Sequence, residues 1–264
     1  MDIFQTIVLA LIQGLSEFLP ISSSAHLLLP KELLGWPDQG LAFDVVVHLG
    51  TLTAVVYFYQ STLRVLANDF YTSIIKRQSV GESRLAWGIL LGTIPVGVSG
   101  FLFKDTIALN FRSLEVVAYT TLIFGILLGV ASWFNTKNTK PRVSINWFDV
   151  LFIGMVQTLA LIPGTSRSGV TITAGLLIGL SRQVSIQFAF LMSIPVITIV
   201  SALILIELYS QLQVVNMSLL FLGFIVSLLS SYFTIVFFIK LLDRIGMMPF
   251  VVYRLLLGIY LLTL

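Results

Sequence analysis

Long apolar runs, separated by short polar segments, are the feature that most constrains the fold of this chain. Runs near 20 residues are typical of helices that cross a bilayer. Only 10% of the residues are charged, whereas a soluble domain carries about 25%. We therefore expect an all-α polytopic membrane protein, with one membrane domain over residues 1–264. The runs lie roughly at 3–19, 41–59, 85–103, 114–134, 148–163, 170–180, 187–208, 216–239 and 250–263.

The charge pattern and the residue types exclude several classes of protein. The net charge is only +3, and the basic residues lie between the apolar runs. They are interpreted as topology signals, so no nucleic-acid partner is expected. The chain has no cysteine, which excludes disulfides and thiol redox chemistry. The first run begins at Ile3 without a basic segment before it. We expect this run to belong to the mature fold rather than to a cleaved signal.

Two places in the chain interrupt apolar runs with polar residues. The first run stops at Pro20 and a serine cluster, and the runs 148–163 and 170–180 are separated by PGTSRSG. Polar backbone at membrane depth is tolerated only where protein or water surrounds it. Each interruption therefore predicts a re-entrant helix hairpin.

The distribution of Lys and Arg predicts the topology. The loops 60–84, 135–147 and 240–248 carry basic residues and should be cytoplasmic, whereas 209–215 carries none and should be external. Counting the crossings then makes 148–180 a hairpin that enters from the cytoplasm. By the same logic, residues 1–34 form a hairpin that enters from outside, and both termini are external.

The two interrupted segments resemble each other. Gln13 matches Gln157, Leu15 matches Leu159, and Pro20 matches Pro163 with one gap. One copy starts each half, so we predict an inverted-topology repeat. The first repeat would span about 1–134 and the second about 148–264. Substrate sites in such folds lie near the midplane, where the broken helices meet.

Glu17 and Arg167 are charged residues within these apolar segments. A charge at the bilayer centre costs about 2.5–3.5 kcal/mol on insertion scales. The simplest reconciliation is that the two hairpin tips face each other in a wet cavity, with Glu17 and Arg167 as partners directly or through a ligand. The alternative is an ion pair that only holds the repeats together.

Small polar residues surround these two charges and favour a binding site over a purely structural pair. Helix N-termini after Pro20 and Pro163 would offer free N–H groups, and with Arg167 they would form an anion site suited to phosphate. Single serines in membrane helices more often serve packing, but two facing clusters do not fit that interpretation. The candidate phosphate-binding residues are Ser22, Ser24, Gly164, Thr165, Ser166 and Ser168, and Ser23 beside them is a candidate catalytic hydroxyl.

Two histidines and a glutamine complete the set of candidates. His26 follows Ser23 by three residues, so on a helix the imidazole could act as base on the hydroxyl or as acid on a leaving oxygen. His48 could line the same cavity or serve only the structure. Gln13 and Glu17 share a helical face and offer oxygens, the ligand type that Mg²⁺ or Ca²⁺ prefers.

These segments resemble a known family. QGLSEFLPISSSAH (13–26) and PGTSRSG (163–169) are similar to two signatures of the undecaprenyl-diphosphate phosphatases, also called bacitracin-resistance proteins. FDVVVHLGTLTAVV and MPFVVYR resemble further family segments. The resemblance implies a bacterial inner-membrane hydrolase that converts undecaprenyl diphosphate to undecaprenyl phosphate and inorganic phosphate, with a divalent cation and a site open to the periplasm. Its glutamate, serine, histidine and arginine correspond to Glu17, Ser23, His26 and Arg167.

The chain departs from the family pattern at three positions: Gln13 where Glu is common, Ala25 where Gly is common, and His48 where Gln is usual. The first removes one anionic candidate for a metal ligand. Three nucleophiles stay open, namely Ser23, His26 and an activated water. A lipid or ion transporter on the same repeat is the alternative function, and an interaction protein without chemistry is a third. The spacing GILLG, Gly125 to Gly129, could pack helices within a subunit or between the subunits of a homodimer.

Overall fold

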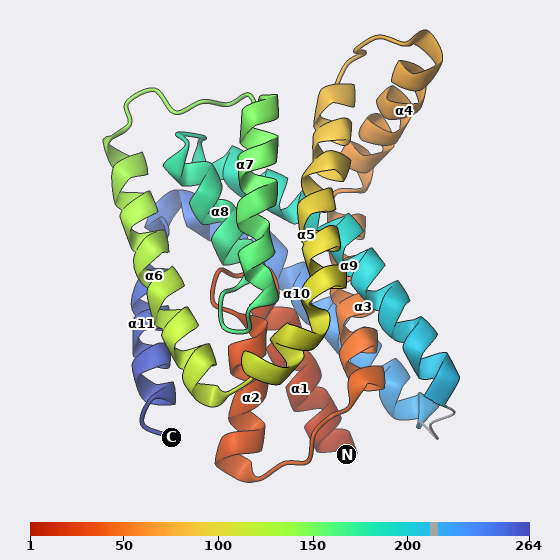
Figure 1. Cartoon of the computed structure of the whole chain (residues 1–264), viewed down its shortest axis with the longest axis vertical. Helices are drawn as coiled ribbons and strands as arrows, with labels where there is room; N and C mark the ends of the chain where they lie inside the picture. Colours follow the sequence, from red (N-terminus) through yellow and green to blue (C-terminus); the bar gives the residue numbers. More distant parts are fainter. Residues whose placement is uncertain (212–215) are drawn as a thin grey trace.

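The computed structural model describes residues 1–211 and 216–264, and the described chain is built from helices (Figure 1). Five of the described helices are long and apolar enough to cross a membrane: α3, α5, α6, α9 and α10. The expectation of an all-α polytopic membrane protein is therefore confirmed. The helices are α1 (Ile3–Ser16), α2 (Ser23–Leu34), α3 (Leu41–Phe58), α4 (Gln60–Lys76), α5 (Ser83–Asn110), α6 (Leu114–Lys137), α7 (Trp147–Gln157), the short 3₁₀ turn η1 (Thr158–Leu161), α8 (Arg167–Leu177), α9 (Arg182–Gln211), α10 (Met217–Ile245) and α11 (Met248–Leu261).

Polar residues at helix starts explain where several of these helices begin. Asp2 and Gln5 form a capping box at the start of α1, and Asn146 and Asp149 form another at the start of α7. Each box satisfies N–H groups that have no partner within the helix. The helix starts are thus set locally by the sequence, before any tertiary packing.

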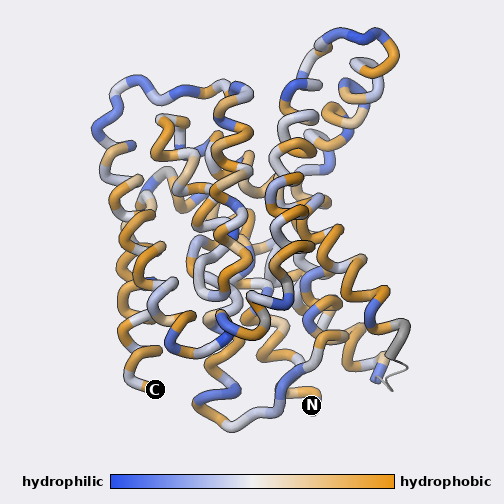
Figure 2. Tube along the Cα trace, viewed as in Figure 1, coloured by the Kyte–Doolittle hydropathy of each residue, from blue (hydrophilic) through white to orange (hydrophobic). Residues whose placement is uncertain are grey.

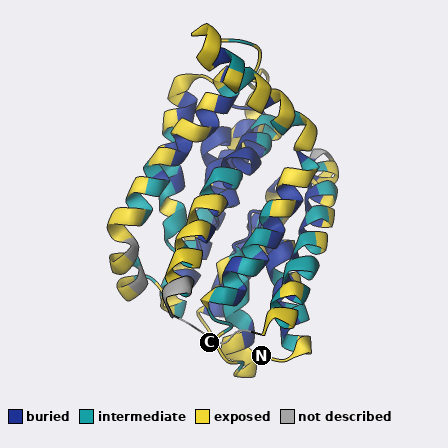
Figure 3. Ribbon diagram, turned by 90° about the vertical axis from the view of Figure 1, so that its right-hand side faces the viewer, coloured by how far each residue is buried: buried dark blue, intermediate teal, exposed yellow. Residues whose placement is uncertain are grey.

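The outward faces of the long helices are apolar. Phe101, Ile206 and Phe221 are each more than two-thirds exposed, and the exposed faces run along the helices (Figure 3). Hydrophilic residues gather instead in the loops at the ends of the molecule and where the chain turns in its middle (Figure 2). Continuous apolar surface of this kind marks contact with lipid, which agrees with the membrane assignment.

The segment 60–84 was expected to be a loop, and this expectation was wrong for residues 60–76, which form α4. No proline or glycine interrupts these residues, so nothing in the backbone prevents a helix. α4 returns along α5, where the Trp87 indole N–H donates to Ser73 Oγ over 3.2 Å. α4 and the start of α5 project from one end of the molecule (Figure 1).

The two glycines of GILLG pack inside the subunit. A Cβ on Gly125 would lie 3.1 Å from Cβ of Arg254, and one on Gly129 would lie 3.1 Å from Cγ1 of Val251. Both neighbours belong to α11, so this glycine face brings α6 and α11 together within one chain. A homodimer stays a prediction and would need another surface.

Two helix hairpins approach each other from opposite ends of the molecule. Figure 1 shows α1 and α2 at the end that carries both termini, α7 and α8 toward the other end, and their connecting turns midway. This arrangement agrees with the predicted hairpins, but the inverted repeat, its boundaries and the re-entrant topology stay predictions. Of the loop 209–215 that was expected outside, residues 212–215 lie outside the described residues.

Candidate active site

The first tip, residues 20–25, starts helix α2 with a left-handed residue. Ser22 has φ 73° and ψ 99°, and its Oγ accepts a hydrogen bond from the N–H of Ala25 over 3.4 Å. A positive φ is uncommon outside glycine and costs energy. The cap offsets part of that cost, and the abrupt start leaves the positive end of the α2 dipole at the tip.

The second tip, residues 163–169, repeats this geometry at the start of α8. Ser166 has φ 69° and ψ 111°, and its Oγ accepts from the N–H of Gly169 over 3.1 Å. Gly164 has φ +88°, and a Cβ there would lie 2.1 Å from Thr120 Oγ1 and 2.5 Å from the Val117 carbonyl oxygen. Glycine is therefore required for both the backbone conformation and the close approach to α6.

The two tips touch each other directly. Arg167 donates from its guanidinium to Glu17 Oε1 over 2.7 Å, which confirms the predicted pairing. The Gly164 N–H donates to Ser24 Oγ over 3.1 Å, and Ser168 Oγ donates to the Leu19 carbonyl over 2.9 Å. The ion pair thus lies within a wider set of contacts between segments that are far apart in sequence.

Arg254 on α11 fixes both tips, and its role was missed in the sequence analysis. Its side chain is fully buried, and it donates to the carbonyls of Pro20, Gly164 and Thr165, as well as to Thr121 on α6. Helix starts at positive φ leave carbonyls that no helix bond uses. A guanidinium has five donors in a fixed plane, so one residue can hold several of these oxygens at once.

Glu17 is the centre of the polar contacts at the first tip. Its side chain is 7% exposed, yet both carboxylate oxygens have partners. Oε1 accepts from Arg167, whereas Oε2 accepts from Gln13 Nε2 over 2.8 Å and from Ser23 Oγ over 2.9 Å. Charge-assisted bonds of this kind offset the cost of burying a carboxylate. Ser23 therefore points its hydroxyl at a potential proton acceptor.

His26 does not pair with Ser23, although their spacing allowed it. Its Nδ1 lies 2.7 Å from the Ser22 carbonyl, and its Nε2 lies 2.6 Å from the hydroxyl of Tyr253. The imidazole and phenol rings are stacked, with centroids 5.5 Å apart. Tyr253 is a second residue that the sequence analysis missed. Because both ring nitrogens have other partners, His26 lacks the direct contact that a base on Ser23 needs.

A cavity of 360 Å³ lies at the two tips. Its polar lining includes Glu17, Ser23, Arg167 and the three predicted phosphate-binding serines Ser22, Ser24 and Ser166. Its apolar wall comes from α3, α5, α9 and the turn η1. Gly164, Thr165 and Ser168 belong to the second tip but are absent from the cavity lining, and all three are buried. Thus the three serines at helix starts face the cavity, and the other three predicted residues support the tip.

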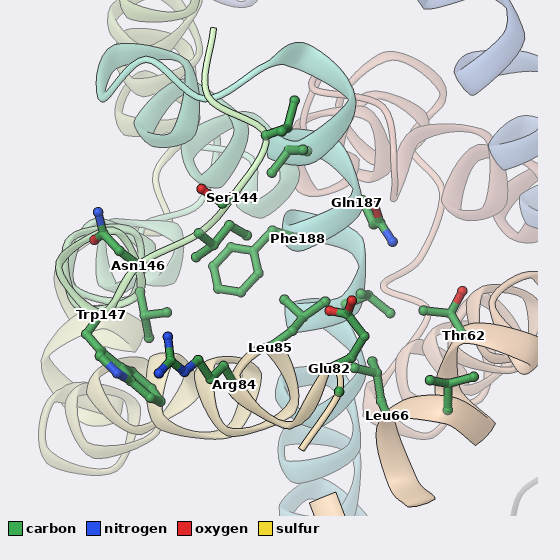
Figure 4. Close-up of a pocket in the computed structure, with 17 residues that line it drawn as sticks. Thr62, Leu66, Glu82, Arg84, Leu85, Ser144, Asn146, Trp147, Gln187 and Phe188 are labelled. Atoms are coloured by element: carbon green, nitrogen blue, oxygen red, sulfur yellow. The ribbon is translucent and has the colours of Figure 1, made fainter. Parts of the chain in front are cut away.

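A larger cavity, of 840 Å³, lies elsewhere (Figure 4). It is formed by α4, α5, the segment before α7 and the first half of α9, and its lining includes Arg84, Trp147 and Phe188. None of the predicted site residues is part of this described lining. Size alone therefore does not identify the active site; the paired charges and hydroxyls do.

The fold and these contacts define a multi-pass membrane protein in which two helix-hairpin tips meet at a polar cavity. A profile of the family described as bacitracin resistance protein BacA matches residues 6–260, so the chain belongs to this family. The undecaprenyl-diphosphatase of Ruthia magnifica subsp. Calyptogena magnifica is 67% identical over 261 residues, which cover 99% of this chain and 98% of that protein. Undecaprenyl-diphosphatase 2 of Stutzerimonas stutzeri (strain A1501) is 52% identical over 266 residues, covering 100% and 98%. The resemblance stated from the two signatures is confirmed.

Proposed function

We propose that this protein is an undecaprenyl-diphosphate phosphatase, which hydrolyses the diphosphate to undecaprenyl phosphate and inorganic phosphate. The names of its relatives support this hydrolase over a transporter. The observation that carries the proposal is the Glu17–Arg167 pair, which shares a cavity with the Ser23 hydroxyl. An ion pair that served only to join the tips would not need a hydroxyl bound to the same carboxylate.

The cavity offers the groups that a diphosphate requires. Arg167 provides a planar cation for phosphoryl oxygens, and Ser24 and Ser166 provide hydroxyls on the two tips. α2 and α8 both begin at the cavity, so the positive ends of their dipoles favour an anion there. The apolar wall, with Val196 and Val200, suits the first isoprene units of the lipid.

The geometry favours Ser23 as the nucleophile over His26. In the first step Ser23 Oγ attacks the terminal phosphorus, and its proton passes to Glu17 Oε2, 2.9 Å away. The Oγ–P bond forms as the bridging P–O bond breaks, and undecaprenyl phosphate leaves with that electron pair. Water then cleaves the phosphoserine, which releases phosphate, and Glu17 returns the proton to Ser23. Arg167 stabilises the charge that develops on the phosphoryl oxygens.

Direct attack by water is the other route that this site allows. Glu17 would then accept a proton from the water, and Ser23 would bind the substrate instead of attacking it. The roles of His26 in this proposal are to hold the first tip through the Ser22 carbonyl and to position Tyr253.

A divalent cation, Mg²⁺ or Ca²⁺, is part of the proposal. The donors fit such an ion: Glu17 is a carboxylate, and Gln13 Oε1 is buried without a hydrogen-bond partner among the described groups. Rotation of the Gln13 amide would turn this oxygen toward Glu17, where the amide nitrogen now lies. When bound, the ion would neutralise phosphate charge. No cluster of three acidic, histidine or cysteine residues occurs in the part of the chain that the structure describes, so substrate oxygens must supply further ligands.

We place the protein in the bacterial inner membrane, with the cavity open to the periplasm. The basic segments 60–84 and 135–147 lie at the end of the molecule opposite the two termini (Figure 1). If these segments are cytoplasmic, the end with the termini is external. The cavity lining includes Leu41 at the start of α3 and Arg112 between α5 and α6, which lie toward that external end.

The experiment is phosphate release from undecaprenyl diphosphate by the purified protein in detergent. We expect release that requires Mg²⁺ or Ca²⁺, stops with EDTA, and falls by about 10³-fold in Arg167→Ala. Ser23→Ala separates the two routes: loss of a phosphoserine nucleophile should reduce the rate at least as much, whereas direct attack by water should leave substantial release. A folded wild-type protein that releases no phosphate would contradict the proposed function.

A further inference from the structure

His48 on α3 presents an unexplained lone pair to the first tip. Its Nδ1 lies 2.7 Å from the Asp44 carbonyl oxygen, which can only accept a hydrogen bond. The Nδ1 atom therefore carries the hydrogen, and in a neutral imidazole the Nε2 atom is an acceptor. The Nε2 atom points to Glu17 Oε2, which lies 3.8 Å away and is also an acceptor.

A metal ion between these two atoms would be attracted by both of them. The distance of 3.8 Å is too long for a direct hydrogen bond. It is shorter than two metal–ligand bonds of about 2.1 Å each, so one ion can contact both atoms. His48 is about one-third exposed and lines the cavity with Glu17, so an ion can reach the gap from solvent.

A second observation also points to a ligand at this position. Gln13 Oε1 is buried and has no hydrogen-bond partner among the described groups, although the other amide atom binds Glu17. Ser23 Oγ lies 2.9 Å from the same carboxylate oxygen. A hydroxyl and an imidazole thus lie beside one carboxylate oxygen, and the Gln13 amide oxygen would join them if the amide rotated. Together these groups offer a metal ion both nitrogen and oxygen ligands, and water or phosphate could occupy its remaining coordination positions.

We propose that His48 Nε2 and Glu17 Oε2 are joint ligands of the divalent cation, and that the site therefore prefers a transition-metal ion such as Mn²⁺ to Ca²⁺. Imidazole nitrogen binds first-row transition-metal ions, of which Mn²⁺ is the weakest binder and serves here as a paramagnetic probe, whereas Ca²⁺ takes oxygen ligands. The proposal deepens the proposed function by assigning the ion a nitrogen ligand. Binding of the ion without substrate does not depend on whether the protein is a phosphatase, so the two proposals can fail separately.

The histidine content makes a spectroscopic test direct, because the chain has only two histidines. The full-length protein is purified in detergent without a polyhistidine tag and titrated with Mn²⁺, and bound ion is counted from its EPR signal. Pulsed EPR of the bound Mn²⁺ should show modulation from an imidazole nitrogen. His48→Gln should remove this modulation and weaken Mn²⁺ binding on the order of 10-fold or more, while His26→Gln should retain it.

Competition with Ca²⁺ gives the second measurement. In wild-type protein, displacement of Mn²⁺ should require an excess of Ca²⁺, and this preference should shrink by about 10-fold or more in His48→Gln. The melting temperature of each variant reports folding. Bound Mn²⁺ without nitrogen modulation, modulation that survives His48→Gln, or no binding by folded wild-type protein would each overturn the proposal. The last result would leave His48 and Glu17 as neighbours with no ion between them.

Discussion

The two tips have almost the same backbone and carry different chemistry. Ser22 and Ser166 adopt similar left-handed conformations, and each caps the helix that follows. Each hydroxyl also lies near that of the serine two positions later, at 3.1 Å in the first tip and 3.2 Å in the second. Between these serines, however, the first tip carries Ser23 and the second carries Arg167.

The residues that precede the two tips also differ in chemistry. Glu17 precedes Ser22 by the same spacing as Leu161 precedes Ser166, so a carboxylate in the first hairpin corresponds to an apolar residue in the second. The two turns have almost the same backbone and each starts a helix, although their side chains carry different chemistry. In the proposed function, the acid and the hydroxyl come from one tip and the cation comes from the other. The following predictions test that division.

Converting the first tip to the second is expected to have the largest effect. Glu17→Leu introduces the residue found at the corresponding position, and it removes the partner of Arg167 and Ser23. Phosphate release should fall by about 10³-fold or more, because both proton transfer and the placement of Arg167 depend on the carboxylate. Initial rates of release from undecaprenyl diphosphate measure this effect.

Glu17→Gln is the matched control for this change, since it keeps the shape and part of the hydrogen bonding. Its loss should be smaller than that of Glu17→Leu if positioning contributes. Equal activity of Glu17→Leu and wild type, in protein of unchanged melting temperature, would show that the two tips are not specialised as argued.

Arg254→Met should destabilise both tips. The variant leaves the carbonyls of Pro20, Gly164 and Thr165 buried without their donor. We expect the free energy of unfolding to fall by about 3 kcal/mol, because each buried acceptor left unpaired costs about 1–3 kcal/mol. Thermal denaturation in detergent reports the change, and Arg254→Lys should recover only part of it because lysine lacks the planar fork. A melting temperature unchanged in Arg254→Met would mean that the direct contacts between the tips hold them without Arg254.

Much of this site could be predicted from the sequence, because charged residues cost free energy within apolar segments and are easy to recognise there. Glu17 and Arg167 stood out as charges at membrane depth, and proline with serine marked both interruptions. Arg254 did not stand out, since it lies near the end of an apolar run, where an arginine can reach the polar interface. Only the packing of α11 against α6 shows that its guanidinium points inward to the tips.

Two kinds of detail could not be predicted correctly from the sequence: the directions in which side chains point and the structure of an amphipathic segment. Spacing placed Ser23 and His26 on one helical face, but it could not show that Ser23 turns to Glu17 and His26 to Tyr253. Those choices depend on which partners other helices supply. α4 was taken as a loop because its mean polarity resembles one, although propensity alone would have permitted a helix.

The capping serines test whether the two backbones are equivalent in energy. Ser22→Ala and Ser166→Ala each remove one cap bond, so each should lower the free energy of unfolding by about 1 kcal/mol. Glycine at either position should cost less than alanine, because it adopts positive φ without strain. Melting temperatures of the four variants check this order. An alanine effect confined to one tip would show that only that turn is under strain.

The smallest effect is expected at Gln157, which corresponds to Gln13 in the first hairpin. Gln13 donates to Glu17, whereas both amide atoms of Gln157 are buried without a partner among the described groups. Leaving a buried polar group unpaired costs about 1–3 kcal/mol, and an apolar residue of similar size removes that cost. Gln157→Leu should therefore be neutral or raise the free energy of unfolding by up to about 1 kcal/mol, with phosphate release unchanged.

Gln13→Leu is the matched variant, because it places the same residue at the corresponding position of the first hairpin. It removes the 2.8 Å bond to Glu17 and the free amide oxygen, so phosphate release should fall by about 10-fold while stability changes little. The contrast follows from the neighbours rather than from the glutamines, since Leu161 cannot accept the bond that Glu17 accepts. If Gln157→Leu lost activity as Gln13→Leu does, Gln157 would need a partner in the working enzyme. The second hairpin would then take part in binding through its helix as well as through its tip.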